Sequence, residues 1–141
     1  MNLKDCLSKG LIKKDKSAPE RVKKSLEISE RFLLSAKKNI EIEELEMSEI
    51  GSYNSIFHSA RSLLFKKECI ERSHICVILA LKEFYKNNHE LINLLNTFDK
   101  IRISRHNIQY GGILIDEEEA EFVYDFANKF LEETKRIINE K

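Results

Sequence analysis

The chain has 141 residues, of which 42% are hydrophobic and 34% are charged, with only four glycines and one proline. This composition fits one folded domain, and so few turn-forming residues favour a mostly helical fold over one with many tight turns. The 24 basic and 24 acidic side chains cancel, but residues 1–40 carry +6 (11 Lys/Arg against 5 Asp/Glu) while residues 111–141 carry −5. One basic surface, and with it a nucleic-acid partner, is therefore neither required nor excluded.

The cysteines and the hydropathy pattern indicate the cellular compartment. Cys6, Cys69 and Cys76 form no C-x-x-C pair, so the sequence predicts neither a disulfide framework nor a zinc site. Cys69 and Cys76 stand among apolar residues, where we expect small core side chains. No apolar run reaches the roughly 18 residues of a membrane span, and no signal-peptide core is present. These features predict a cytoplasmic protein without a membrane partner.

The N-terminal third divides into an arm and the first long helix. Residues 1–16 are expected to be an arm, with a short helix from Asn2 to Ser8 ended by Gly10 and then a solvated lysine-rich connection. Residues 17–141 are expected to form one bundle domain. Pro19 lies near a helix start, and apolar side chains recurring every three or four residues predict a helix to Asn39.

The middle of the chain predicts two further helices. The acidic patch from Glu41 to Glu49 suits a turn followed by a helix N-terminus, and that helix is expected to end near Lys67. Its small residues allow another helix to approach closely; they are Ser52, Ser55, Ser59 and Ala60. Ser73 is expected to cap a third helix from His74 to Lys86.

Two more helices complete the predicted fold. One begins near His89, and whether it continues straight to Tyr110 or bends near Ser104 is open. Gly111-Gly112 ends it as a C-cap. Asp116, followed by three glutamates, is a strong N-cap signal for a last helix to about Ile138. The prediction is an all-α antiparallel bundle of four to five helices.

The stretch from Ile101 to Gly112 collects the most groups able to hold a phosphate or move a proton. Arg102 and His106 share a helix face, as do His106 and Tyr110, whereas Arg105 and Gln109 lie on an adjoining one. Arg105 and Tyr110 point about 140° apart on an ideal helix. They converge if the helix frays before Gly111 or if two copies of a dimer share the site. The competing interpretation is a solvated polar helix end.

A second polar line runs along the predicted helix before Lys67. Asn54 and His58 are four residues apart, Arg61 follows three later, and Tyr53 lies beside them. Such a line on a buried helix usually ties helices together through hydrogen bonds. Its alternative role is ligand binding.

Other chemistries find little support in the sequence. Glu71 and His74 match Glu-x-x-His once, but a di-iron bundle needs a second copy, so we expect no metal. No Gly-x-Ser-x-Gly, Walker or GxGxxG pattern occurs, and no cysteine has an evident histidine partner. We therefore expect no cofactor.

Three segments together resemble the HEPN superfamily, in particular its small stand-alone bacterial and archaeal branch. They are Y-N-S-I-F-H-S-A-R-S-L-L-F with the later Ser73-His74 pair, R-H-N-I-Q-Y-G-G, and a last helix with A-N-K-F-L. The resemblance covers about residues 20–138. It implies a helical bundle, usually a homodimer, that binds RNA or nucleotide. Many members are metal-independent ribonucleases with an R-x(4–6)-H motif, and others are toxins neutralised by a small nucleotidyltransferase.

Carried onto this chain, the motif arginine is Arg105. Where the motif has its histidine the chain has Tyr110, and Gly112 stands where some members carry a tyrosine modified with AMP. His106 directly follows the arginine, so it does not fit the motif by spacing. The polar stretch and the resemblance together make Arg105, His106 and Tyr110 the candidate catalytic residues of an endoribonuclease that departs from the motif. The candidate substrate-binding residues are Arg102, Asn107, Gln109, Tyr53, His58 and Arg61.

Two functions of different classes follow. One is an RNA- or nucleotide-binding HEPN-like protein, a toxin-like partner of a nucleotidyltransferase. The alternative is a non-catalytic dimeric module whose charge-separated faces recognise a protein, which the neutral net charge favours. A plain small-molecule-binding bundle is a third class, and it needs an interior pocket that no sequence shows.

Overall fold

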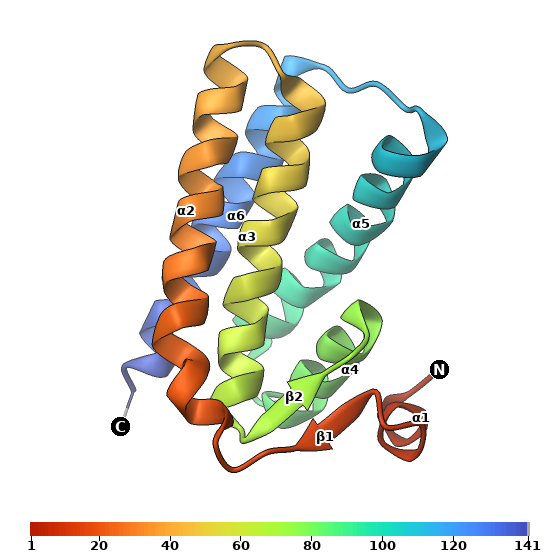
Figure 1. Ribbon diagram of the computed structural model, residues 1–141, viewed down its shortest axis with the longest axis vertical. Coiled ribbons are helices and arrows are strands. Elements are labelled where there is room, and N and C mark those ends of the chain that lie inside the picture. The colour runs from red at the N-terminus through yellow and green to blue at the C-terminus, as the bar shows by residue number, and fades with distance from the viewer. Residues whose placement is uncertain (141) are drawn as a thin grey trace.

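Four long helices form the body of the protein in a computed structural model that describes residues 1–140 (Figure 1). They are α2 (Val22–Glu41), α3 (Leu45–Lys66), α5 (His89–Gly111) and α6 (Glu117–Ile138), with the shorter α4 (His74–Phe84) before α5. Helices α2 and α5 run toward one end of the bundle, and α3 and α6 run toward the other. The predicted all-α bundle is confirmed. None of the described helices is long and apolar enough to cross a membrane.

The helix ends follow the capping signals of the sequence. Ser73, Asn88 and Asp116 each accept a hydrogen bond from a backbone N–H in the first turn of α4, α5 and α6. Gly112 ends α5 in the left-handed conformation, with a φ of 70°. Helix α5 is continuous through Ser104 to Gly111, whereas α4 ends two residues before the predicted Lys86.

Helices α2 and α3 meet along a seam of small polar residues. The Ser29 hydroxyl lies 2.8 Å from Ser59 Oγ and 3.0 Å from Ser55 Oγ, and all three residues are fully buried. A Cβ atom added to Gly51 would stand 3.4 Å from the carbonyl oxygen of Phe32, so the backbones are close here. The predicted close approach at Ser52, Ser55, Ser59 and Ala60 is therefore confirmed.

The lysine-rich connection is not solvated throughout, and that prediction is wrong. Residues Ile12–Lys14 form strand β1, which pairs antiparallel with β2 (Cys69–Glu71), and a 3-10 turn at Ala18–Arg21 leads into α2. Ile12 is only 2% exposed. Burying its apolar side chain favours strand pairing, while the lysines at 13 and 14 face solvent.

A disulfide joins Cys6 to Cys76, so the prediction of no disulfide is also wrong. Cys6 lies in the short helix α1 (Leu3–Ser8), capped by Asn2, and Cys76 lies in the first turn of α4. Their Cα atoms are 5.8 Å apart although 70 residues separate them in the sequence. Cys69 is free and buried, as predicted. The disulfide ties the N-terminal helix to the start of α4.

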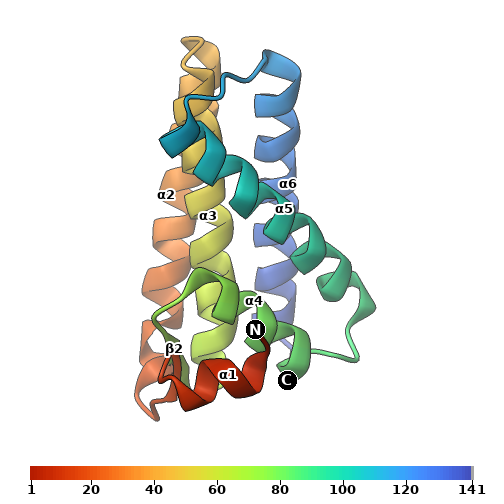
Figure 2. The ribbon, with the colours of Figure 1, turned by 90° about the vertical axis from the view of Figure 1, so that its right-hand side faces the viewer.

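Helix α5 crosses the bundle at an angle (Figure 2). Its first half is anchored in the core by apolar side chains, namely Leu91, Leu94, Leu95, Phe98 and Ile101. Its last turns rise away from α6, so polar side chains there face open space on one side and α3 on the other. This crossing positions the candidate site.

Candidate functional site

The centre of the site is a contact between Tyr53 of α3 and His74 of α4. The Tyr53 hydroxyl lies 2.5 Å from Nδ1 of His74, and the Tyr53 side chain is only 1% exposed. His74 is the first residue of α4, and the N-cap at Ser73 fixes where that helix begins. One tautomer of the imidazole accepts from the phenol and carries its proton on Nε2. The other donates from Nδ1 and leaves Nε2 bare.

Arg105 of α5 completes this centre. Its guanidinium carbon stands 4.5 Å from the centroid of the Tyr53 ring, a cation–π contact. Its NH1 donates to Gln109 Oε1 over 3.0 Å. Its Nε is buried and has no hydrogen-bond partner, and no carboxylate within residues 1–140 forms a salt bridge with it. Arg105 is therefore a half-buried cation without a counter-charge.

Two further arginines flank the centre, and both are held by carboxylates. Arg61 Nε lies 2.7 Å from Glu71 Oε1, at the end of β2, and Arg102 Nε lies 2.9 Å from Asp99 Oδ1. Arg61 also lies over the ring of Phe65, 5.0 Å from its centroid. These contacts orient both guanidinium groups and partly offset their charge.

The surroundings keep His74 neutral. Burial lowers the pKa of His74 below its usual 6.5, and the positive charges of Arg105, Arg102 and Arg61 lower it further. Burial likewise raises the pKa of the Tyr53 phenol, which therefore keeps its proton at neutral pH. The site thus presents a neutral imidazole and a neutral phenol beside a guanidinium cation.

His58 lies one layer away, across Phe57. The Phe57 ring stacks on His74 with centroids 3.9 Å apart and meets His58 edge-on at 5.5 Å. On its far side His58 stacks parallel to Phe32 of α2 at 5.7 Å. Burial, followed by the charge of Arg61, lowers the pKa of His58 to about 4, and its Nδ1 has no partner in the described chain.

The structure brings together five of the residues predicted as site residues: Tyr53, His58, Arg61, Arg102 and Arg105. We call these five, together with His74, the basic cluster. Gln109 touches its edge through Arg105. The polar line on α3 and the polar stretch of α5 therefore meet in one place, which the sequence alone did not predict.

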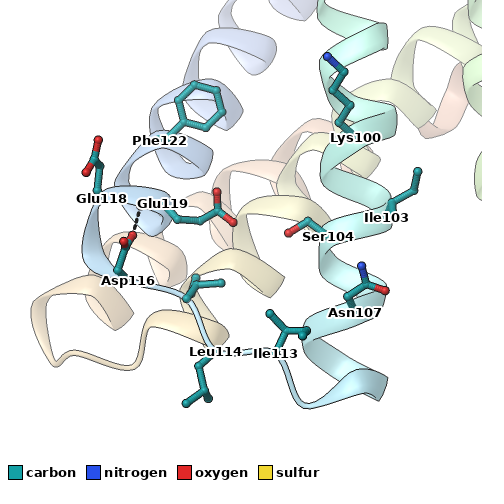
Figure 3. Close-up of a pocket in the computed structure, with 11 residues that line it drawn as sticks. Lys100, Ile103, Ser104, Asn107, Ile113, Leu114, Asp116, Glu118, Glu119 and Phe122 are labelled. Atoms are coloured by element: carbon teal, nitrogen blue, oxygen red, sulfur yellow. Dashed lines mark hydrogen bonds between the residues drawn. The ribbon is translucent and has the colours of Figure 1, made fainter.

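The remaining predicted residues lie on other faces of α5. The rings of His106 and Tyr110 are 5.0 Å apart on an exposed surface, where Tyr110 is 69% exposed. Because α5 stays helical to Gly111, Tyr110 does not turn toward Arg105 within one chain. Asn107 lines a groove beside α6 (Figure 3). Their predicted catalytic and binding roles stay predictions.

His74 is the residue that the sequence analysis did not place in the site. It stood out as half of the Ser73-His74 pair and of a single Glu-x-x-His match, and both features describe a helix start. Its place beside Tyr53 depends on how α4 packs against α3. The one sequence signal that concerned His74 was the predicted N-cap at Ser73, which sets where the first turn of α4 begins.

The fold and site define a helical-bundle protein that holds an unpaired arginine and a neutral imidazole over a buried tyrosine. The family model of the HEPN domain matches residues 22–137, so the chain belongs to the HEPN family. Membership of this family points to a function related to nucleotides or RNA. Neither a curated protein nor a solved structure matches the chain significantly.

Proposed function

We propose that the basic cluster binds a phosphate group of RNA or of a nucleotide, with Arg105 as its main ligand. The observation that carries this proposal is the guanidinium of Arg105, half-buried over Tyr53 and without a carboxylate partner among residues 1–140. A cation in such a place is costly unless an anion joins it. A phosphate supplies both the missing negative charge and paired acceptor oxygens that match the guanidinium fork.

The neighbouring groups support an anion rather than a neutral ligand. Arg61 and Arg102 add positive charge, and both already lower the pKa of His74. Both are held by carboxylates, whereas Arg105 is left for the ligand. The rings of Phe32, His58 and Phe57 pack against one another and lead away from this point.

We further propose that the cluster can cleave RNA without a metal. The 2′-oxygen attacks the adjacent phosphorus, the bond to the 5′-oxygen breaks, and a 2′,3′-cyclic phosphate forms while the 5′-oxygen takes a proton from water. His74 accepts the 2′-hydroxyl proton on Nε2, in the tautomer whose Nδ1–H is donated to the Tyr53 oxygen. Arg105 stabilises the negative charge that develops on the phosphate. His74 would thereby supply the imidazole that the family motif places where this chain has Tyr110.

Replacing Arg105 tests phosphate binding. We expect Arg105→Ala to weaken the binding of a short single-stranded RNA by about tenfold or more, measured by fluorescence anisotropy at low salt. The matched control is Lys129→Ala, because Lys129 is exposed on α6 and its loss changes the net charge equally. Equal affinities for the two variants would refute the assignment.

A separate comparison tests the proton-transfer role. His74→Ala should lower the cleavage rate by about a hundredfold or more while RNA binding persists. The rate of the unchanged protein should fall only below pH 6.5, because the pKa of His74 lies below that value. A loss caused by His106→Ala or Tyr110→Phe, with His74→Ala fully active, would instead assign the role to the exposed pair.

The resemblance extends the proposal to partners. We propose a homodimer in which Arg105 of one copy and Tyr110 of the other line one cleft, and a nucleotidyltransferase as the second protein. Light scattering of the purified chain gives its oligomeric state. A Tyr110→Cys variant that fails to cross-link to Arg105→Cys in a mixed sample would contradict the shared cleft.

A further inference from the structure

The opposite side of α5 borders a groove that the proposed function does not use. The groove has a volume of about 680 Å³ and lies between the last turns of α5, the loop at 113–115 and the start of α6 (Figure 3). A second cavity of about 310 Å³ continues it along α5, because both are lined by Lys100, Ser104, Glu119 and Phe122. Volumes of this size are typical of small-molecule sites.

A buried acid, Glu49 of α3, lies behind the wall of the groove, next to the lining residues Ser104 and Glu119. Glu49 is 0% exposed, and its Oε2 accepts a 2.8 Å hydrogen bond from Ser104, whose side chain lines the groove. Its Oε1 is buried and has no hydrogen-bond partner in the described chain. The carboxyl of Glu119, which points toward Ser104 in Figure 3, is close enough to interact with Glu49. An unpartnered carboxylate oxygen therefore stands just behind the groove wall.

The charges around this acid are mostly negative. From α6, Glu119 faces it and Asp116 and Glu118 line the same groove, and the one basic lining residue is Lys100 of α5. Figure 3 shows the Lys100 ammonium pointing away from Glu119. The acids in the first turn of α6 are explained by the helix dipole. The burial of Glu49 is not, because it lies five residues into a different helix.

The walls of the groove are apolar and open. Ile103, Ile113, Leu114 and Phe122 line it and are each at least half exposed, with Leu114 reaching 80%. Apolar side chains this exposed gain when an aliphatic group covers them. The groove thus combines an acidic floor with hydrocarbon walls.

We propose that this groove binds a small aliphatic amine, whose ammonium group passes between Ser104 and Glu119 to meet Glu49. The ammonium would donate to the free oxygen of Glu49 and to Glu119, and its alkyl chain would lie against Leu114 and Phe122. An amine supplies the three donors that a pair of carboxylates can accept. A neutral alcohol of the same shape could donate a single hydrogen bond but would bring no charge to offset that of the carboxylates.

Binding is coupled to a proton on Glu49. The pKa of Glu49 is raised to about 7, chiefly by burial, with the Ser104 hydrogen bond lowering it and the charge and hydrogen bonding of Glu119 raising it. The cation needs the ionised carboxylate, so it displaces that proton. Affinity should therefore rise as the pH increases through about 7.

Calorimetric titration with hexylamine, and with 1-hexanol as its neutral counterpart, tests the site. We expect hexylamine to bind about tenfold more tightly than hexanol at about pH 8, and to lose that advantage at about pH 5. Glu49→Gln keeps an acceptor for Ser104 and should lower hexylamine affinity about tenfold. The matched control Glu121→Gln, at an exposed position of α6 outside the groove, removes the same charge and should change the affinity less than about twofold.

Other outcomes would overturn the proposal. Equal hexylamine affinity in Glu49→Gln and Glu121→Gln would show that the amine does not bind Glu49. If hexanol binds as tightly as hexylamine, the groove is an apolar site that does not recognise the ammonium group. A third titration, with acetyl-Leu-Lys-Leu-amide, distinguishes a small amine from a lysine side chain of a protein. If this peptide binds and hexylamine does not, the groove accepts a protein segment and the small-amine assignment fails.

Discussion

The basic cluster and the groove beside α6 lie on opposite sides of α5 and carry opposite charge. The cluster lies between α5, α3 and α4, and the groove lies between α5 and the start of α6, with Glu49 of α3 behind its wall. Tyr53 and Glu49 are one turn apart on α3, and Arg105 and Ser104 are neighbours on α5. In the basic cluster, Arg105 lies over Tyr53 and has no counter-charge among the described residues. Behind the groove, Glu49 is buried and has no cation beside it among the same residues. Arg105 lies over Tyr53 while its neighbour Ser104 contacts Glu49, because adjacent side chains of one helix point about 100° apart.

This difference teaches that one helix can separate two charged sites over a single turn. Each site keeps one ionisable group short of a partner, and such groups cluster where ligands bind. The two sites differ in how they are held. The disulfide anchors the start of α4 beside the basic cluster, whereas α5 leans away from α6 at the groove.

Removing the disulfide should have the largest effect on stability. Closing a loop of 70 residues stabilises a fold by about 4 kcal/mol in the chain-entropy account, so Cys6→Ser should lower the free energy of unfolding by roughly that amount. Urea unfolding measures it. A reductant should lower the stability of the unchanged protein equally and leave Cys6→Ser unaffected. Hydrogen exchange should rise around His74 and stay constant at Ser104, and a uniform rise would contradict the comparison.

The second effect concerns the groove and depends on pH. Because the folded pKa of Glu49 is about 7 against 4.5 for a free glutamate, the folded state binds more protons between these values. Stability therefore falls as the pH rises from 4.5 to 7, by roughly 3 kcal/mol at most, and levels off above 7. Glu49→Gln should flatten this part of the profile. Thermal unfolding across the range checks it, with Glu118→Gln as the variant expected to keep the slope.

The smallest effect concerns the hydrogen bond inside the basic cluster. Tyr53→Phe keeps the ring beneath Arg105 but removes the hydroxyl bonded to His74, so stability should fall by about 1 kcal/mol. Chemical denaturation gives the value. If the bond also selects the tautomer of His74, the imidazole nitrogen shifts should change in an NMR spectrum. Unaltered shifts would mean that the tyrosine serves packing alone.

The sequence predicts most of the helices because local signals determine them. Asp116 with its following glutamates and Ser73 before α4 mark helix starts through contacts within one turn. Residues 12–14 and 69–71 were not predicted to pair, since a three-residue strand has no signal without a partner 57 positions away. The disulfide was missed for the same reason.

The site could be predicted only in part. Arg105 and Tyr53 were both named from the sequence, but their contact depends on the crossing of α5 over α3. Glu49 belonged to an acidic patch that is mostly solvated, and its burial depends on how α5 and α6 pack beside α3. The sequence thus identified residues by their own chemistry and their spacing along one helix. It did not identify the contacts that depend on how two or three helices pack together.

The serine seam between α2 and α3 also constrains how the protein can move. A contact made of methyl groups tolerates sliding, but the hydroxyl of Ser29 finds its partners Ser55 and Ser59 at one relative height of the two helices. If α2 slid along α3 by one helical turn, about 5.4 Å, these buried hydroxyls would lose their hydrogen-bond partners. Helix α2 is thus locked in register, and Phe32 stays stacked on His58. Any conformational switching in this bundle should therefore be carried by α5, which rests on no such seam.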